Sequence, residues 1–215
     1  MCRESCGLNS LASIIGILKN SYVKDLVAAR VEEFKRNRSK PITEIFKELC
    51  FCILTANFNA EKAIRMQAEI DDGFLSLPED ELAKSLRALG HRYPDSRAKY
   101  IVEARRLIPE IERILNSPID EKALRDWFAK NVKGLGYKES SHFLRNIGFM
   151  NLAIIDFHIT NLLSRYGLME KPKTMTKRRY IEAEKILIKL SKITGLSLGE
   201  LDLYLWFIET GKILK

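Results

Sequence analysis

The sequence has no long hydrophobic run, almost no glutamine and no cysteine after residue 52. Its most apolar stretches, residues 12–18 and 51–54, fall far short of the roughly 20 residues that a membrane-spanning helix needs. The N-terminus lacks the basic start, apolar run and small-residue cleavage site of a signal peptide. We therefore expect a cytoplasmic protein. Gln67 is the only glutamine, whereas Lys, Glu and Arg are abundant, a bias that fits a thermophilic source.

The cysteine pattern gives little support for a metal centre. The four cysteines are Cys2, Cys6, Cys50 and Cys52, and an intracellular chain more often keeps such thiols reduced. Cys2 and Cys6 could begin a metal site, but no second closely spaced pair of ligands follows them. Cys50 and Cys52 are two positions apart in a predicted helix, so they point to different faces. We expect neither a bound metal nor an iron–sulfur cluster.

The charge balance indicates a polyanionic partner. The 215 residues include 36 Lys and Arg against 28 Asp and Glu, which gives a formal net charge of +8. Hydrophobic residues make up 46% of the chain, a globular composition of the size of one large domain or two small ones. Nucleic acid is the first partner to consider for such a chain.

Helical periodicity runs through almost the whole sequence, and no stretch shows the strict alternation of a strand. We therefore predict an all-α fold of about eleven helices. The segment 41–56 is apolar around most of its circumference, so we expect it to be buried. The predicted helices span residues 11–18, 22–35, 41–56, 60–70, 79–89, 94–115, 120–131, 138–147, 157–166, 177–194 and 197–210.

The most informative segment is 131–149, where two glycines separate two predicted helices. Gly134 and Gly136 permit positive φ angles and close backbone approach, and Leu135 between them can fill the angle between the helices. The free N–H groups at the start of the second helix suit a phosphate. This is the pattern of a helix-hairpin-helix DNA-binding element. A tight helical hairpin without a ligand is the alternative, and the basic net charge favours DNA.

Two chemically capable residues follow this turn. Lys138 comes two positions after Gly136, and Asp156 follows four apolar residues at the start of the next predicted helix. Taken singly, Lys138 can be explained as a phosphate contact and Asp156 as a helix N-cap. The two together form a more specific arrangement than either residue alone.

With Gly134, Gly136, Lys138, Asp156 and His158, the sequence resembles the helix-hairpin-helix DNA glycosylase superfamily. Members share a G-x-G-x-K turn and a D-x-H motif about twenty residues later. The resemblance implies that Lys138 is the nucleophile of a bifunctional glycosylase/lyase and that Asp156 is its catalytic carboxylate. It also implies a two-lobed fold with the active site between the lobes. The resemblance also implies a prokaryotic monomer that needs no cofactor. Its substrate would be damaged double-stranded DNA, so we expect it to be associated with the nucleoid.

Two upstream segments extend the resemblance to DNA contacts. Asn57, in "CILTANFNAEKA", falls where the family supplies a polar residue to the DNA. His91, Arg92 and Tyr93 fall in a segment that resembles the one wedged into the duplex. The ordinary alternatives are a helix C-cap for Asn57, a phosphate contact for Arg92 and local packing for Tyr93.

The C-terminal end resembles one subfamily. The endonuclease III branch carries four cysteines around an iron–sulfur cluster, and this sequence has none there. The short chain and the ending "LYLWFIETGKILK" resemble the small 8-oxoguanine DNA glycosylase/lyases of archaea and thermophiles. The resemblance assigns base recognition to the carboxylate of Lys215, and Trp206 is a suitable stacking platform. A frayed end and core packing are the ordinary alternatives.

The implied function is base-excision repair. The enzyme would flip 8-oxoguanine out of the duplex, form a Schiff base through Lys138 and nick the strand by β-elimination. The same chemistry on an oxidised pyrimidine or an abasic site remains an alternative, as does a non-catalytic DNA-binding module. Lys138→Gln separates enzyme from module, because only an enzyme would lose incision while keeping DNA binding. A monovalent cation at the hairpin is neither shown nor excluded by the sequence.

We expect residues 1–215 to form one glycosylase unit with two lobes. The central helical lobe would span about 41–130. The second lobe would hold the hairpin within about 120–215, together with N-terminal helices over 9–37.

Overall fold

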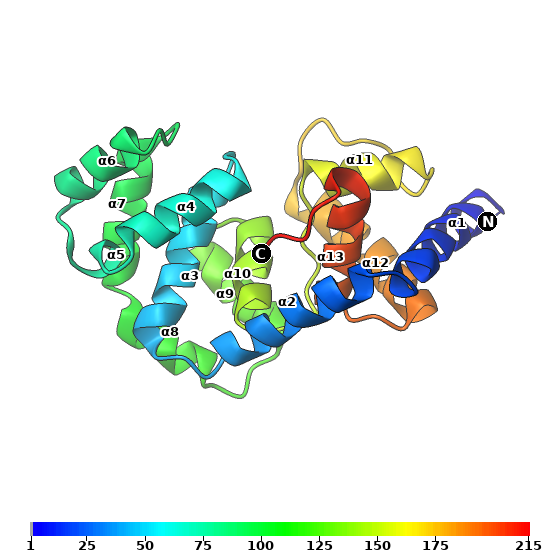
Figure 1. Cartoon of the computed structure of the whole chain (residues 1–215), viewed down its shortest axis with the longest axis horizontal. Coiled ribbons are helices and arrows are strands. Elements are labelled where there is room, and N and C mark those ends of the chain that lie inside the picture. Colours follow the sequence, from blue (N-terminus) through cyan, green and yellow to red (C-terminus); the bar gives the residue numbers. More distant parts are fainter. Residues whose placement is uncertain (1) are drawn as a thin grey trace. The chain divides into compact units, whose positions relative to one another are not determined.

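The structure is a computed structural model that describes residues 2–215, with side chains from residue 4 onward. The described residues form thirteen helices and no strand, which confirms the predicted all-α class (Figure 1). The helices are α1 (Cys2–Lys19), α2 (Val23–Asn37), α3 (Ile42–Thr55), α4 (Ala60–Ile70), α5 (Gly73–Ser76), α6 (Glu79–Ala88), α7 (Pro94–Arg105), α8 (Ile108–Leu115), α9 (Glu121–Asn131), α10 (Tyr137–Asn146), α11 (Phe157–Arg165), α12 (Lys177–Thr194) and α13 (Leu198–Thr210).

The helix predicted over 94–115 is in fact two helices. Helix α7 ends at Arg105, and α8 begins at Ile108. Pro109 explains the break, because a proline inside a helix lacks the N–H donor and its ring clashes with the carbonyl four residues earlier. In the first turn of α8 the same residue is well tolerated, since those N–H groups have no partner within the helix.

The chain divides into two compact units. The first unit comprises Met1–Lys35 and Gly148–Lys215, and the second comprises Arg36–Ile147. The hairpin therefore groups with the central helices, not with the C-terminal helices as the sequence suggested. The reason is packing: α10 lies against α3 and α9, and the ring of Phe143 is 4.9 Å from that of Phe128.

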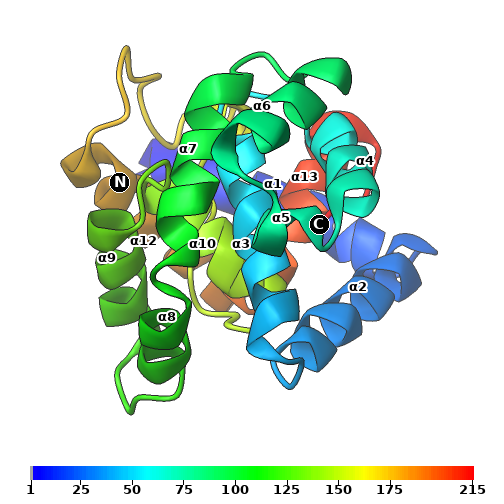
Figure 2. The same cartoon turned by 90° about the vertical axis from the view of Figure 1, so that its left-hand side faces the viewer.

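Helix α3 is the centre of the second unit. It packs against α4, α5, α7, α8 and α10 (Figure 2). Phe46, Leu49 and Phe51 are fully buried, which confirms the burial expected from its apolar circumference. On α9, Trp127 lies edge-on to Phe128 at 5.0 Å and extends the aromatic packing of this core.

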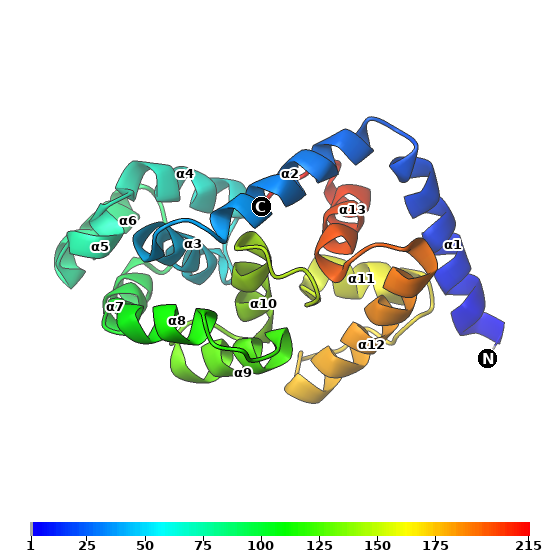
Figure 3. The ribbon, with the colours of Figure 1, turned by 90° about the horizontal axis from the view of Figure 1, so that it is seen from below.

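Helix α13 organises the first unit by packing against α1, α11 and α12 (Figure 3). Its N-terminus is capped by Ser197, whose Oγ accepts the N–H of Glu200. Its C-terminus stops at Gly211, which takes the left-handed conformation with φ 69°. Residues 212–215 continue as an irregular tail.

Cys6, Cys50 and Cys52 form no disulfide bond among the described residues. The side chain of Cys2 lies outside the described residues. Burial raises the pKa of the Cys50 thiol, so this group is held in the unreactive protonated form. Over residues 2–215, no helix combines the length and apolarity needed to cross a membrane.

Candidate active site

The glycine turn has the geometry expected of a helical hairpin. Gly134 adopts φ +87°, and Leu135 is buried in the angle between α9 and α10. A Cβ atom at Gly134 would lie 2.7 Å from Cδ2 of Tyr100. The ring of Tyr100 therefore occupies the space that any side chain at Gly134 would need. Gly136, the N-cap of α10, has φ −95°, so its role does not depend on a left-handed conformation.

Lys138 is the second residue of α10 and stands at the open end of the turn. Its side chain is 23% exposed, and its Nζ lies 3.9 Å from Oε1 of Glu139. The other carboxylate oxygen of Glu139, Oε2, accepts the N–H of Gly136 at 3.2 Å. The turn thus presents a partly shielded amine next to a carboxylate that also holds the backbone.

Helix α7 ties two further predicted segments to this turn. Arg97 is buried, and its Nη2 donates a hydrogen bond of 2.6 Å to the carbonyl of Ala56. Asn57, which follows Ala56 in the chain, is exposed and has the left-handed φ of 56°. The guanidinium of Arg97 also lies 5.6 Å from the ring centroid of Tyr93 and 5.9 Å from that of Tyr100. One arginine therefore contacts the Asn57 loop, the Tyr93 segment and the ring beneath Gly134.

His91 supports this segment from below. Its Nδ1 accepts the N–H of Tyr93 at 3.0 Å. The remaining proton must therefore be on Nε2, which donates to the carbonyl of Leu54 at 3.1 Å. Burial lowers the pKa of His91, in keeping with a neutral ring. The next two side chains, Arg92 and Tyr93, are exposed and lie against each other at 5.1 Å.

Asp156 lies in the first unit, at the start of α11. Its Oδ1 accepts the N–H of Ile159 at 3.0 Å, which confirms the predicted N-cap. Its Oδ2 makes no hydrogen bond within the described residues. The preceding segment, Leu152–Ile155, is irregular and buried, so the position of Asp156 is fixed by core packing.

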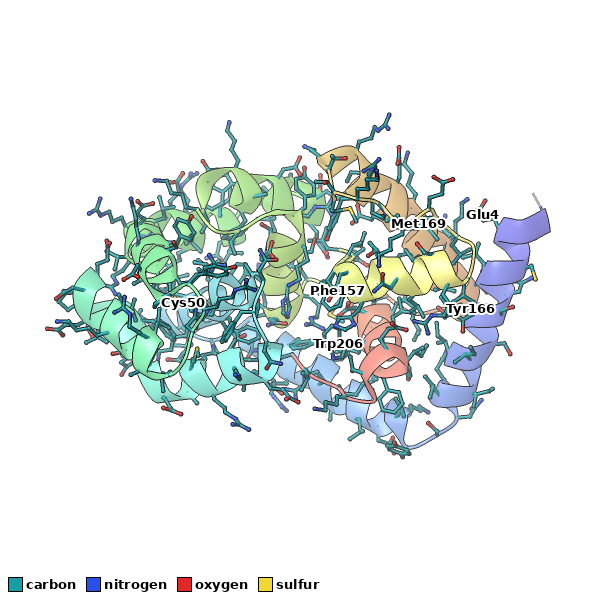
Figure 4. The ribbon with its side chains drawn as sticks, turned by 90° about the horizontal axis from the view of Figure 1, so that it is seen from above. Glu4, Cys50, Phe157, Tyr166, Met169 and Trp206 are labelled. Carbon is teal, nitrogen blue, oxygen red and sulfur yellow. The ribbon has the colours of Figure 1, made fainter. Side chains whose placement is uncertain are left out.

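Three aromatic rings follow one another beside Asp156. Phe157 lies over His158 at 3.8 Å, and His158 is edge-on to Trp206 at 4.9 Å. Figure 4 shows Phe157 at the start of α11 and Trp206 on α13. The ring of Phe157 is 65% exposed. The indole Nε1 of Trp206 is buried and has no acceptor among the described residues.

Each unit holds part of the predicted set. Lys138, the hairpin glycines, Asn57 and Tyr93 belong to the second unit, where α7 connects their loops. Asp156, Trp206 and the tail ending at Lys215 belong to the first unit. Among the side chains of residues 4–215, no cluster of three or more His, Cys, Asp or Glu could hold a metal ion.

Three residues that contribute to this geometry were not singled out from the sequence. They are Arg97, Tyr100 and Glu139. A signal existed for the first two, because they follow Tyr93 at spacings of four and seven and so share its helix face. Glu139 is three residues after the N-cap and accepts its N–H, as the Glu of a capping box does. The sequence does not reveal this, because the N-cap is Gly136 and not the Ser or Thr of the usual motif.

The fold and the glycine turn define a helix-hairpin-helix DNA glycosylase. A family profile described as 8-oxoguanine DNA glycosylase matches residues 27–196. The chain is 55% identical over 210 residues to the 8-oxoguanine DNA glycosylase/AP lyase of Korarchaeum cryptofilum, covering 97% of this chain and 100% of the relative. The chain therefore belongs to the 8-oxoguanine DNA glycosylase family, which confirms the resemblance found in its motifs.

Solved structures agree with this assignment. The chain matches the Methanocaldococcus jannaschii 8-oxoguanine glycosylase/lyase in complex with a 15mer DNA containing 8-oxoguanine, with a TM-score of 0.93 and 50% identity. That match covers 96% of this chain and 100% of the other. The 8-oxoguanine DNA glycosylase of Thermotoga maritima matches with a TM-score of 0.90 and 44% identity, over 97% of this chain and 100% of the other.

Proposed function

We propose that this protein removes 8-oxoguanine from double-stranded DNA and then cleaves the strand at the resulting abasic site. The observation that carries the proposal is Lys138, a partly shielded amine placed directly after a DNA-binding type of turn. Similarity to glycosylase/AP lyases, and to one whose structure contains 8-oxoguanine DNA, supports both the chemistry and the lesion.

Lys138 is the proposed nucleophile. Its neutral amine attacks C1′ of the extruded nucleotide, and the C1′–N9 bond breaks as the base leaves with the bonding electrons and takes up a proton. The attached nitrogen gives up a proton, and the sugar ring then opens: the C1′–O4′ bond breaks, O4′ takes up a proton and the nitrogen lone pair forms an iminium at C1′. This electron sink allows loss of a proton from C2′ and cleavage of the C3′–O bond, which nicks the strand.

Asp156 is the proposed catalytic carboxylate. Its two oxygens are used differently, because Oδ1 is committed to the cap of α11 and Oδ2 has no partner in the described residues. A carboxylate fixed in this way can stabilise the positive charge that develops on the sugar, or transfer a proton. Because the preceding segment, Leu152–Ile155, is buried, it restricts the movement of Asp156.

The remaining candidates divide into duplex contacts and base contacts. For the duplex we propose the hairpin backbone at Gly134 and Gly136, with Arg92 and Tyr93 as the exposed side chains that fill the gap left by the flipped base. Asn57 is the proposed contact on the neighbouring loop. His91 supports Tyr93, since its ring is buried and both nitrogens are engaged within the protein.

For the base we propose Trp206 and the C-terminal carboxylate of Lys215. Trp206 offers a ring face on which the flipped base can stack. A terminal carboxylate supplies two acceptors for the N–H groups on a purine edge. Amine and carboxylate chemistry of this kind needs no cofactor, so we propose that incision is insensitive to EDTA.

Borohydride trapping tests the proposal. The protein is incubated with a duplex that holds one 8-oxoguanine opposite cytosine, reduced, and analysed on a denaturing gel. We expect a covalent complex that disappears in Lys138→Gln, while that variant still binds the duplex. Lys133→Gln is the matched control, because it removes the same charge from an exposed residue of the same turn. It should keep the covalent complex and show only a salt-dependent loss of affinity.

Two other outcomes would change the proposal. Trapping on thymine glycol or on an abasic site, but not on 8-oxoguanine, would keep the lysine chemistry and replace the lesion. Binding without trapping on any substrate would remove the enzymatic function and leave a DNA-binding module.

A further inference from the structure

Glu139 faces two groups of the hairpin at once. Its Oε2 accepts the N–H of Gly136 at 3.2 Å, and its Oε1 lies 3.9 Å from Nζ of Lys138. The side chain is only 17% exposed. One oxygen of this carboxylate thus contacts the hairpin backbone, and the other lies near the proposed nucleophile.

The first contact completes the turn. Gly136 is the N-cap of α10 and has no side chain, so it cannot satisfy the free N–H groups of the first helical turn in the usual way. Glu139 reaches back from the third helical position and takes the N–H of Gly136 itself. The carboxylate also offsets the positive end of the helix dipole.

The second contact concerns the amine. Lys138 is in the first turn of α10, where the helix dipole and the free N–H groups repel a positive charge. A lysine side chain has four rotatable bonds and, left alone, would swing its ammonium into water. The carboxylate at 3.9 Å attracts the ammonium form and so keeps Nζ beside the turn until the amine loses its proton and can attack.

The carboxylate of Glu139 also acts on Arg97 of α7. Burial lowers the pKa of Arg97, and the negative charge of Glu139 acts in the opposite direction. Glu139 therefore lies in the field of the arginine that also binds the carbonyl of Ala56. This places Glu139 where the hairpin, the amine and α7 meet.

We propose that Glu139 is the positioning residue of Lys138, with one oxygen fixing the hairpin backbone and the other holding the amine for attack on C1′. The inference rests on the proposed function, because it gives Lys138 the role of nucleophile. Glu139 then contributes in two ways, through its hydrogen bond to the turn and through its charge near the amine. A substitution to alanine would remove both at once.

Glu139→Gln and Glu139→Ala separate these contributions. The Gln variant retains an amide oxygen that can accept the Gly136 N–H but has no charge for the amine. We expect it to keep the melting temperature and the affinity for a duplex with a tetrahydrofuran abasic analogue. Its single-turnover trapping rate on a natural abasic duplex at saturating protein should fall by about tenfold or more. The Ala variant should lose rate, affinity and thermal stability together.

Glu103→Gln is the matched control. Glu103 pairs with Lys133 at 3.0 Å beside the same turn and is not paired with Lys138. Its replacement removes an equal charge from the same neighbourhood, so its trapping rate should equal that of the unaltered protein.

The outcomes discriminate clearly. If the Gln variant traps as fast as the unaltered protein, Glu139 is only a helix cap and the inference is wrong. If Glu103→Gln slows trapping equally, the effect is general electrostatics and the inference is again wrong. If the unaltered protein does not trap abasic DNA at all, it is the proposed function that fails.

Discussion

The hydroxyl of Tyr180 donates a hydrogen bond of 2.6 Å to the carbonyl of Ala153, three residues before Asp156. The N–H of Ala153 is in turn accepted by Oε1 of Glu184 at 3.3 Å. Tyr180, Glu184 and Ala153 are all buried. Helix α12 therefore satisfies both backbone groups of Ala153, in a segment that has no helix or strand partner of its own.

Tyr180→Phe should loosen this segment. It leaves the buried Ala153 carbonyl without its donor, at an expected cost of about 1–2 kcal/mol in the free energy of unfolding. Excision of 8-oxoguanine should slow several-fold in single turnover, because Asp156 is less well held, while DNA affinity stays the same. Tyr22→Phe makes the same atomic change at a side chain that is 70% exposed, and it should alter stability by less than about 0.5 kcal/mol. Equal unfolding curves for the two variants would contradict the argument.

The buried ring of His91 should make the protein sensitive to mild acid. Burial holds its folded-state pKa below 6.5, so the unfolded chain binds the proton more readily. The free energy of unfolding should therefore fall as the pH drops below about 6.5, and continue to fall through the folded-state pKa. Melting temperatures between pH 5 and 8 measure this trend. His91→Gln should show a shallower dependence on pH, and an unchanged dependence would show that other groups cause it.

Replacing Gly134 should cost more free energy of unfolding than replacing a glycine that has a positive φ but open space around its Cα. Gly134 and Gly90 have similar positive angles of 87° and 81°. A Cβ at Gly90 meets nothing within 4 Å, whereas one at Gly134 meets the ring of Tyr100 at 2.7 Å. Gly90→Ala should cost about 1–2 kcal/mol. Gly134→Ala should cost a further 1–3 kcal/mol or so from the clash, measured by urea unfolding. Similar losses would mean that the ring moves aside freely.

The local structure of the chain follows closely from its sequence. The apolar spacing predicted most of the helices, and the cap at Asp156 was predicted and confirmed. These features depend on residues within one turn of each other, so a sequence contains the information directly. The break at Pro109 is local in the same sense, because a proline within a helical segment usually ends the helix.

The supporting contacts could not be obtained in this way. Tyr180 meets Ala153 across 27 positions of sequence, and Arg97 meets Ala56 across 41. Nothing near a tyrosine or an arginine in sequence says which distant carbonyl it will bind. The grouping of the hairpin with α3 is of the same kind, since it depends on which of several apolar faces meets the buried face of α10.

The division into two units has a spectroscopic consequence. The chain contains two tryptophans, and one falls in each unit: Trp127 on α9 in the second, and Trp206 on α13 in the first. Replacing either with phenylalanine leaves tryptophan emission from one unit alone. Fluorescence of the two variants during denaturation will therefore report whether the unit with Lys138 and the unit with Asp156 unfold in one transition.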